Sequence, residues 1–317
     1  MSGHVLSVGD LVIDLIMPVS LPLLPAQHQN VDFLKIEPGG ASNFMIAARH
    51  MGLRVSSVGA LGDDMFGAEL MRILHEVGVE TDLVYVEPDT RSTTVMVLTD
   101  QSTGQHVFIG HYGNGNEAPY TAAIDALVAS VDAVLIQGYT YYERRVVTMA
   151  MQTIIRAREL GLPVYLDIGP MMAQLTAERA QWAVSHADII FLTEDEVPLA
   201  AAGRTGQEAY QYLFGSGVRQ IILKQGAHGC SIITASGIQH VPGFRVQVVD
   251  TVGAGDSFDA AFITGNLAGM DAHQSALLGN AMGAACVQKV GAGRSVPTCD
   301  EVKAVLRGNK IDLGFEC

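Results

Sequence analysis

The sequence predicts an α/β fold in which a mostly parallel central sheet is covered by helices on both faces. Short apolar, β-branched runs alternate with longer segments rich in alanine and leucine, and this order is typical of a parallel sheet with crossover helices. The chain has 317 residues, 49% of them hydrophobic, so it can bury a large core without metals or disulfides. Two segments break the alternation and predict a second, smaller sheet.

In the first part of the chain, periodicity predicts strands over Val5–Val8 and Val55–Ala60. It predicts helices over Asn43–Met51 and Phe66–Glu76, each ending near a glycine, the usual residue at a helix C-terminus. From residue 133 onward the alternation is regular. It predicts strands over Ala133–Gln137, Val164–Asp167, Ile189–Leu192 and Ile221–Lys224, and helices over Arg144–Leu160, Ala177–His186 and around Tyr210.

The two exceptions are Leu15–Pro38, which contains four prolines, and Ser92–Gly110, which is rich in threonine and valine and is typical of a β-hairpin. We expect residues of about 15–38 and 91–112 to form a small sheet that projects from the main one. It would be either a decorative insertion or a lid that closes on a substrate and excludes water. Because no linker or internal repeat divides the chain, residues 1–317 are interpreted as a single domain.

Charge and cysteine usage limit the partners. The chain carries 19 Lys and Arg against 33 Asp and Glu, a net charge of −14, and it shows no basic stripe. Nucleic acid and anionic membranes are therefore not expected partners. The four cysteines lack metal-ligand spacing and are more typical of free thiols in a reducing compartment. With no signal-peptide pattern and no membrane-length apolar run, we expect a cytoplasmic protein.

The most informative segment is Arg245–Gly269. It predicts a strand over Arg245–Val249, a glycine-rich turn at Gly253–Gly255 and a helix over about Ser257–Leu267. Glycines let the backbone approach a ligand closely, and a helix N-terminus offers free N–H groups and a partial positive charge. Together they predict a cradle for a phosphate or another anion.

Asp256 lies at the mouth of that cradle. A carboxylate there would repel a phosphate, so its expected role is a general base that takes the proton of a hydroxyl attacking the phosphoryl group. On these residues alone, a tight turn with Asp256 as an ordinary N-cap is the simpler interpretation. The preceding Asp250-Thr251 pair and a second glycine-rich loop at Val290–Ser295 favour a nucleotide site instead.

A second group, Gly39-Gly40-Ala41-Ser42-Asn43, opens a predicted helix. The glycines allow a small polar ligand to come close, and the Asn43 amide can both donate to and accept from a sugar hydroxyl. Asp14 could accept hydrogen bonds from a diol. Taken singly, each of these residues is as well explained by helix capping or a solvated loop. The P-loop pattern GxxxxGK[ST] is absent, which excludes that route to ATP.

These residues resemble the signatures of the ribokinase-like, or PfkB, carbohydrate kinases. The C-terminal signature D-T-x-G-A-G-D-x-F is intact as Asp250–Phe258, and the N-terminal signature is present as Gly39–Asn43. Two intermediate glycine motifs also follow the family pattern, at Gly59–Gly67 and Lys224–Gly229. The resemblance implies a ribokinase-like three-layer sandwich with a mostly parallel central sheet and a small β-sheet lid. It also implies transfer of the γ-phosphoryl group of ATP to a sugar hydroxyl, with Mg²⁺.

By this resemblance Asp256 is the base, and an anion hole is formed by Gly253, Ala254 and Gly255. The sugar would be held by Asp14, Gly39, Gly40 and Asn43. The nucleotide pocket would be lined by Thr193, Lys224, Gly226, Gly229 and Asn280. Glu196 would organise Mg²⁺ through water, although Thr193 replaces the usual asparagine of that motif. A monovalent cation such as K⁺ would bind at Asp250, Val252, Gly291 and Ser295. The family's lid is often a dimer interface, so a homodimer is expected.

Two other functions stay open at this point. A nucleoside kinase of adenosine type would need an apolar or aromatic slot for a base, which Phe33, Leu34, Phe108 and Tyr112 could supply, although only 6% of the chain is aromatic. A non-catalytic binding protein on the same scaffold is disfavoured by the intact Asp256 and glycine cradle. The sequence leaves the acceptor open among ribose, fructose, an acid sugar and a nucleoside.

Overall fold

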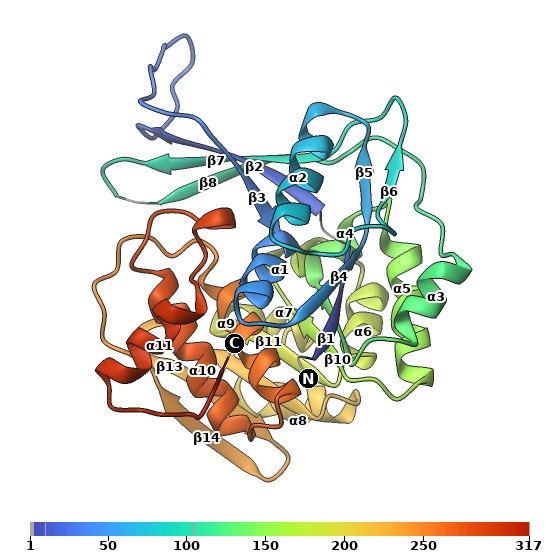
Figure 1. Cartoon of the computed structure of the whole chain (residues 1–317), viewed down its shortest axis with the longest axis vertical. Helices are drawn as coiled ribbons and strands as arrows, with labels where there is room; N and C mark the ends of the chain where they lie inside the picture. The colour runs from blue at the N-terminus through green and yellow to red at the C-terminus, as the bar shows by residue number, and fades with distance from the viewer. Residues whose placement is uncertain (1–2, 10, 104, 317) are drawn as a thin grey trace.

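The computed structural model describes residues 3–9, 11–103 and 105–316. In these ranges eight strands form a sheet in the order β14-β13-β12-β11-β10-β9-β1-β4 (Figure 1). All neighbours from β4 to β12 are parallel, and β13 and β14 join antiparallel at one edge. The predicted α/β class with a mostly parallel sheet is confirmed. The strands are β1 (His4–Val8), β4 (Arg54–Val58), β9 (Ala133–Gln137), β10 (Val164–Asp167), β11 (Ile189–Thr193), β12 (Gln220–Lys224), β13 (Gly229–Thr234) and β14 (Gly237–Pro242).

The central strands are buried on both faces, and successive residues feed two separate cores. In β9, Ala133 and Leu135 pack into one core while Val134 and Ile136 pack into the other. This is the period-two alternation of a strand. Because both faces are covered, almost every residue of these strands is apolar. Their positions could therefore be predicted from the sequence.

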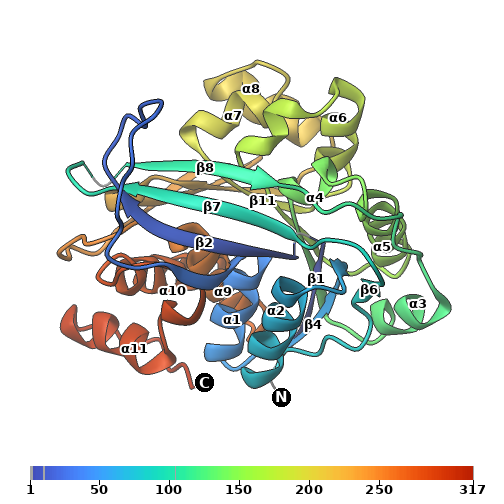
Figure 2. The same cartoon turned by 90° about the horizontal axis from the view of Figure 1, so that it is seen from above.

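Helices cover each face of the sheet (Figure 2). No helix in the described ranges is long and apolar enough to cross a membrane. One face carries α1 (Ala41–His50), α2 (Met65–Glu76), α9 (Ala254–Leu267), α10 (Ala272–Cys286) and α11 (Cys299–Gly308). The other face carries α3 (Ala122–Val128), α4 (Gly138–Tyr142), α5 (Val147–Glu159), α6 (Ala177–Ser185), α7 (Val197–Ala200) and α8 (Gly206–Gly215).

A second sheet lies beside the carboxyl edge of the first (Figures 1 and 2). Its four strands have the order β3-β2-β7-β8. The pair β2–β7 is parallel and the other two pairs are antiparallel. A short parallel pair, β5–β6, lies at the start of the connection to β7. The strands are β2 (Leu11–Val19), β3 (Lys35–Gly40), β5 (Ala60–Gly62), β6 (Tyr85–Glu87), β7 (Thr93–Asp100) and β8 (His106–His111).

The small sheet expected from residues of about 15–38 and 91–112 is therefore present, with a longer first part. Strand β2 already begins at Leu11, and β3 continues to Gly40. Asp14 pairs with Glu37 on β3 and with Val95 on β7. These three residues share one face of the sheet, because paired residues point to the same side.

Three local predictions need correction. Arg245–Val249 is not a strand: Val248 and Val249 are more than half exposed, and this segment has no ladder partner in the described residues. The helix after the glycine turn begins at Ala254 rather than Ser257. The run Val55–Ala60 divides into β4 and the first residue of β5, because the chain leaves the large sheet at Gly59 to form the short pair with β6.

The cysteines also depart in part from the expectation of free thiols. Cys230 and Cys286 are free and buried, as expected. Cys299 is in a disulfide, so the expectation is wrong for this residue. The fourth cysteine, Cys317, lies outside the described residues.

Candidate active site

The carboxyl ends of four parallel strands meet beside the N-terminus of α9. Gln137, Asp167, Thr193 and Lys224 are the last residues of β9, β10, β11 and β12. Asp256 lies in the first turn of α9. In open α/β sheets, ligands bind at this edge, so the topology gathers these five polar residues where a substrate can reach them.

The first turn of α9 has the backbone features expected of an anion cradle. Gly253 caps the helix in the left-handed conformation, with φ of 74°, and a Cβ added there would lie 2.7 Å from the Ala292 Cβ. No side chain caps this end. The Ala254 amide donates to the Thr251 carbonyl at 3.3 Å. The amides of Gly253, Gly255 and Asp256 have no hydrogen-bond partner in the described part of the chain, so this turn presents free donors to an anion.

The Asp256 carboxylate is held by two side-chain amides. Its Oδ1 accepts a hydrogen bond from Gln137 Nε2 at 2.6 Å, and its Oδ2 accepts one from Asn43 Nδ2 at 3.2 Å. Burial and the nearby charge of Asp167 raise the pKa of Asp256 to about 6, against the opposing effects of Lys224 and the two amides. A carboxylate with this pKa accepts a proton readily near neutral pH and is suited to general base catalysis.

The residues predicted to hold a sugar lie next to Asp256. The Asp14 carboxylate packs directly on Gly39, where an added Cβ would lie 2.3–2.4 Å from its oxygens, and Gly40 caps α1 with φ of 51°. Asn43 is already engaged, since its Oδ1 also accepts from the Gly293 amide at 2.7 Å. The Asp14 carboxylate has no hydrogen-bond partner among the described residues. Burial and the Asp256 charge raise its pKa to about 7.

Lys224 is part of a buried charge cluster beneath the cradle. Its ammonium donates to Asp167 Oδ1 at 2.8 Å and lies 3.3 Å from both oxygens of Asp259. A Cβ added to Gly255 would lie 3.4 Å from the ammonium. Despite burial, these carboxylates raise the pKa of Lys224 above its usual value, so the lysine stays charged. It adds positive potential behind the anion cradle.

Thr193 and Glu196 form a capping box after β11. The Thr193 amide donates to Glu196 Oε2 at 2.8 Å, and the Thr193 side chain bonds the Glu196 backbone. Burial and the nearby Asp167 charge raise the pKa of Glu196. Thr193 is thus a cap that orients Glu196. No group of three or more metal-ligating side chains occurs within the described ranges, but Asp167 and Glu196 together supply two carboxylates at the sheet edge.

Of the other residues predicted to line a nucleotide pocket, Gly229 and Asn280 have structural partners, and the space beside Gly226 is open. Gly226 takes φ of 56° in the turn after β12, and a Cβ added there would have no heavy atom of the described residues within 4 Å, its chain neighbours aside. A Cβ on Gly229 would lie 2.2 Å from the Val241 carbonyl, so this glycine is required by packing. The Asn280 amide donates to the carbonyls of Val241 and Pro242 at 3.1 and 3.2 Å. Asn280 therefore fixes the end of β14, and its donor group is engaged.

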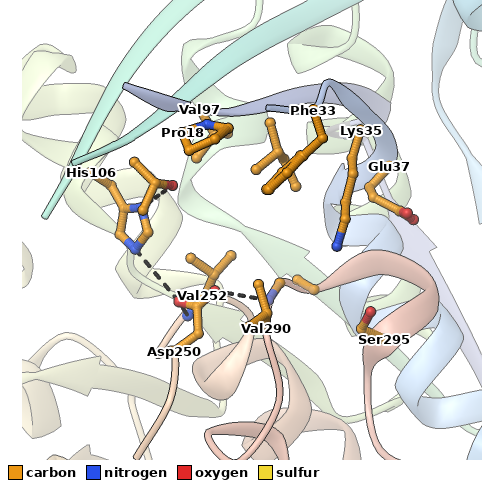
Figure 3. Close-up of a pocket in the computed structure, with 14 residues that line it drawn as sticks. Pro18, Phe33, Lys35, Glu37, Val97, His106, Asp250, Val252, Val290 and Ser295 are labelled. Atoms are coloured by element: carbon orange, nitrogen blue, oxygen red, sulfur yellow. Dashed lines mark hydrogen bonds and ion pairs between the residues drawn. The ribbon is translucent and has the colours of Figure 1, made fainter. Parts of the chain in front are cut away.

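The four residues predicted to bind a monovalent cation do come together. Asp250, Val252, Gly291 and Ser295 line one cavity of about 90 Å³ between the second sheet and the loops around α9 and α10 (Figure 3). Both Asp250 oxygens accept backbone hydrogen bonds, from Val252 at 3.1 Å and from Gly291 at 2.8 Å. Neither Asp14 nor Asp256 lines this cavity.

Polar contacts join the second sheet to these loops. His106 Nε2 on β8 lies 3.5 Å from Asp250 Oδ1 (Figure 3). Arg294 forms an ion pair with Glu37 of β3 at 3.0 Å and donates to the Ile36 carbonyl at 3.1 Å. The Arg294 side chain is 47% exposed, whereas those of Glu37, His106 and Asp250 are mostly buried.

Among the site residues, sequence reasoning missed Gln137 and Asp167. Both lie at the ends of strands that were predicted with the correct bounds. A polar residue at the carboxyl end of a buried parallel strand was the available signal. Asp259 was also missed, because an aspartate in an apolar helix gives no indication of the lysine that it meets.

Comparison with known proteins agrees with this geometry. The sequence model of the pfkB carbohydrate kinase family matches residues 2–299. An ATP-dependent ribose-1-phosphate kinase of Halopiger xanaduensis is 32% identical over 276 residues, which are 85% of this chain and 87% of that protein. A 5-dehydro-2-deoxygluconokinase of Bacillus subtilis is 23% identical over 88% of this chain and 89% of its own.

Solved structures show the same fold. The structure of Arabidopsis thaliana ribokinase complexed with ribose and ATP superposes with a TM-score of 0.83. The two proteins are 24% identical, and the match covers 97% of this chain and 99% of the ribokinase. The ribokinase-like sandwich implied by the sequence signatures is therefore confirmed. With a family match that covers nearly the whole sequence, the chain belongs to the pfkB family of carbohydrate kinases.

Proposed function

We propose that this kinase transfers the γ-phosphoryl group of ATP to a hydroxyl of a sugar or sugar-like acceptor, with Asp256 as the general base. One observation carries the assignment: a carboxylate with a pKa of about 6 lies in the same helical turn as free backbone amides. The base and the anion cradle are thus fixed on one rigid element. Phosphoryl transfer is catalysed mainly by such positioning and charge stabilisation.

The proposed reaction is an in-line displacement. Asp256 takes the proton of the acceptor hydroxyl as that oxygen attacks the γ-phosphorus. A new P–O bond forms, the bond to the bridging oxygen of ADP breaks, and the electron pair leaves with ADP. The amides of Gly253, Gly255 and Asp256 bind the negative charge on the transferred phosphoryl oxygens. The positive charge of Lys224, which lies behind these amides, adds to this stabilisation.

Magnesium fits the remaining carboxylates. Mg²⁺ is commonly held by one or two carboxylates together with substrate phosphates and water. The charge of Asp167 helps to raise the pKa of Glu196 at the sheet edge, and we assign both carboxylates to the water shell of the ion. The metal would neutralise the phosphate oxygens and shield the nucleotide from these acidic groups.

We assign the acceptor to the space between Asp14 and Asp256. Asp14 would accept two hydrogen bonds from a diol, since its oxygens have no partner in the described residues. Gly39 and Gly40 keep the backbone close to the ligand, and Asn43 acts chiefly by holding Asp256. The nucleotide would cross the turn at Gly226, with Thr193, Gly229 and Asn280 fixing the shape of its pocket.

The acceptor class is tested by a panel of substrates. ADP formation would be measured with pentoses, hexoses, sugar acids, sugar phosphates and nucleosides at fixed ATP·Mg²⁺. We expect turnover with a non-nucleoside sugar. Two of the aromatic residues that could hold a base have different surroundings: Phe33 lines the cavity of Figure 3, while Tyr112 packs on Tyr142. Preference for a nucleoside would overturn the sugar assignment while leaving the kinase assignment intact.

We further propose that residues of about 11–40 and 91–112 act as a lid within the single domain. Asp14 lies on this sheet, whereas Asp256 lies on the main body. Closure of the lid would therefore bring Asp14, the proposed ligand of the diol, towards Asp256, the proposed base. The base of β2 is anchored in the main core by Leu11 and Ile13, while the sheet meets the loops around α9 and α10 through polar contacts such as the Arg294–Glu37 pair. Closing would exclude water from the transferred phosphoryl group.

A monovalent cation is proposed at the cavity of Figure 3. Backbone carbonyls near Val252 and Gly291, with the Ser295 hydroxyl, are oxygen ligands of the kind that K⁺ prefers. We expect the rate with KCl to exceed the rate with choline chloride severalfold at equal ionic strength, because the ion would fix the loops beside the cradle. Equal rates in the two salts would contradict the assignment.

We also propose a homodimer through the second sheet. The face opposite Asp14 exposes Met96, Val107 and Ile109, neighbouring apolar side chains that would be covered by a second copy. Light scattering after gel filtration is expected to give twice the chain mass. Ile109→Asp should give the monomer mass without loss of fold. A monomeric wild type at micromolar concentration would be inconsistent with this assembly.

A further inference from the structure

Gln137 makes the shortest described contact to the Asp256 carboxylate. It is the last residue of β9, paired across the ladder with Asp167 at the end of β10. Its side chain is almost fully buried and donates from Nε2 to Asp256 Oδ1 at 2.6 Å. A contact of this length between an amide and a carboxylate is a strong, charge-assisted hydrogen bond.

Packing alone does not explain a glutamine at this position. Its Oε1 is buried and has no hydrogen-bond partner in the described part of the chain. Gln137 precedes α4 but its side chain does not cap that helix. An unpaired buried acceptor is unfavourable, and an apolar residue would fill the same volume without it. The one interaction that offsets this cost is the hydrogen bond to Asp256.

We propose that Gln137 is a positioning residue that holds the Asp256 carboxylate in the orientation that receives the proton of the acceptor hydroxyl. The inference rests on the proposed role of Asp256 as the base. Gln137 and Asn43 each bond one carboxylate oxygen. The carboxylate plane is thereby fixed, and each oxygen keeps a lone pair free for the acceptor.

The charges around Asp256 make this amide important. Asp167 on β10 favours the protonated form of Asp256, while Lys224 on β12 favours the charged form. The Asp256 charge in turn raises the pKa of Asp14 on β2 and of Asp259 on α9. The Gln137 amide adds a neutral donor that stabilises the charged form. Without it, the carboxylate would be both less well oriented and more readily protonated.

The test compares Gln137→Met, which keeps the length and removes the donor, with the wild type. We expect kcat to fall about tenfold or more, as for loss of a hydrogen bond to a charged group. KM for acceptor and ATP should change little, and the acid limb of the kcat profile should move to higher pH. A merely structural role would leave that limb in place. Gln137→Glu should lose more activity, because two carboxylates would then face each other.

Thr140→Val is the matched control. It removes a buried hydrogen bond to the Val8 carbonyl in the same segment without touching Asp256, and should keep the wild-type pH profile. A kcat within about twofold of wild type, with an unmoved acid limb, in folded Gln137→Met would overturn the proposal. Failure of both Gln137 variants to fold would overturn it too, since the residue would then serve packing. Asp256→Asn in the same assay separates the two claims: if it retains turnover, the base assignment itself fails.

Discussion

The Asp256→Asn variant is expected to lose about 10²–10⁴-fold in kcat, the usual contribution of a general base. Asparagine has nearly the same shape and can still meet one of the two amides that hold Asp256, but it cannot take the hydroxyl proton. ATP binding should be unchanged or stronger, because a carboxylate beside the anion cradle repels the phosphates. Steady-state rates and calorimetric titration with an ATP analogue measure the two quantities separately.

Asp195→Asn provides the control for a generic loss of acidic charge. Asp195 is an exposed carboxylate in the turn after β11, and its variant should retain wild-type turnover. If Asp256→Asn kept more than about a tenth of the wild-type kcat, another group would have to be the base. Weakened ATP binding with unchanged kcat would instead make Asp256 a nucleotide ligand.

The Asp14→Asn variant is expected to lose about 10²-fold or more in kcat/KM for the acceptor. Hydrogen bonds to a charged group contribute about 1.5–3 kcal/mol each, and Asp14 is placed to make two with a diol. The loss should appear mainly in KM for the acceptor, with KM for ATP unaffected. Initial rates over a grid of the two substrates measure this. An unchanged KM for the acceptor would place the sugar elsewhere.

The same variant should be more stable than the wild type at pH 8. The pKa of Asp14 is raised to about 7 in the folded protein, from an ordinary value of 3.8. The folded state therefore binds this proton more strongly than the unfolded state, and the carboxyl destabilises the fold as pH rises from about 4 to about 7. Asparagine removes that penalty, which should raise Tm by about 2–4 °C for each kcal/mol relieved. The gain should vanish below pH 4.

The central strands of the large sheet could be predicted because they are buried on both sides and therefore appear as short, continuous apolar runs. Ala133–Gln137 and Val164–Asp167 have the predicted ends. The same reliance on apolar runs explains why a strand was wrongly predicted over Arg245–Val249. That segment has the valines of a strand, but strand formation depends on a neighbour with free backbone groups, and no local pattern reports whether one is present.

Part of the candidate site could be predicted because some of its residues lie in local sequence motifs. Gly253, Asp256 and Asn43 belong to short motifs whose spacing reflects a local turn. Gln137 and Asp167 are single residues, 119 and 89 positions away from Asp256 in the chain. Only the parallel order of the strands brings them to it. The nucleotide role of Asn280 stays a prediction: its amide donor bonds the carbonyls at the end of β14, a contact that no local pattern indicates.

The most direct test of the account is a crystal structure with the preferred acceptor and a non-hydrolysable ATP analogue with Mg²⁺. The account predicts that one acceptor hydroxyl lies about 2.6–3.2 Å from an Asp256 carboxylate oxygen. The same hydroxyl should be in line with the γ-phosphorus, whose oxygens should accept from the amides of Gly253, Gly255 and Asp256. A γ-phosphate bound away from these amides, or a reactive hydroxyl paired with another side chain, would contradict it.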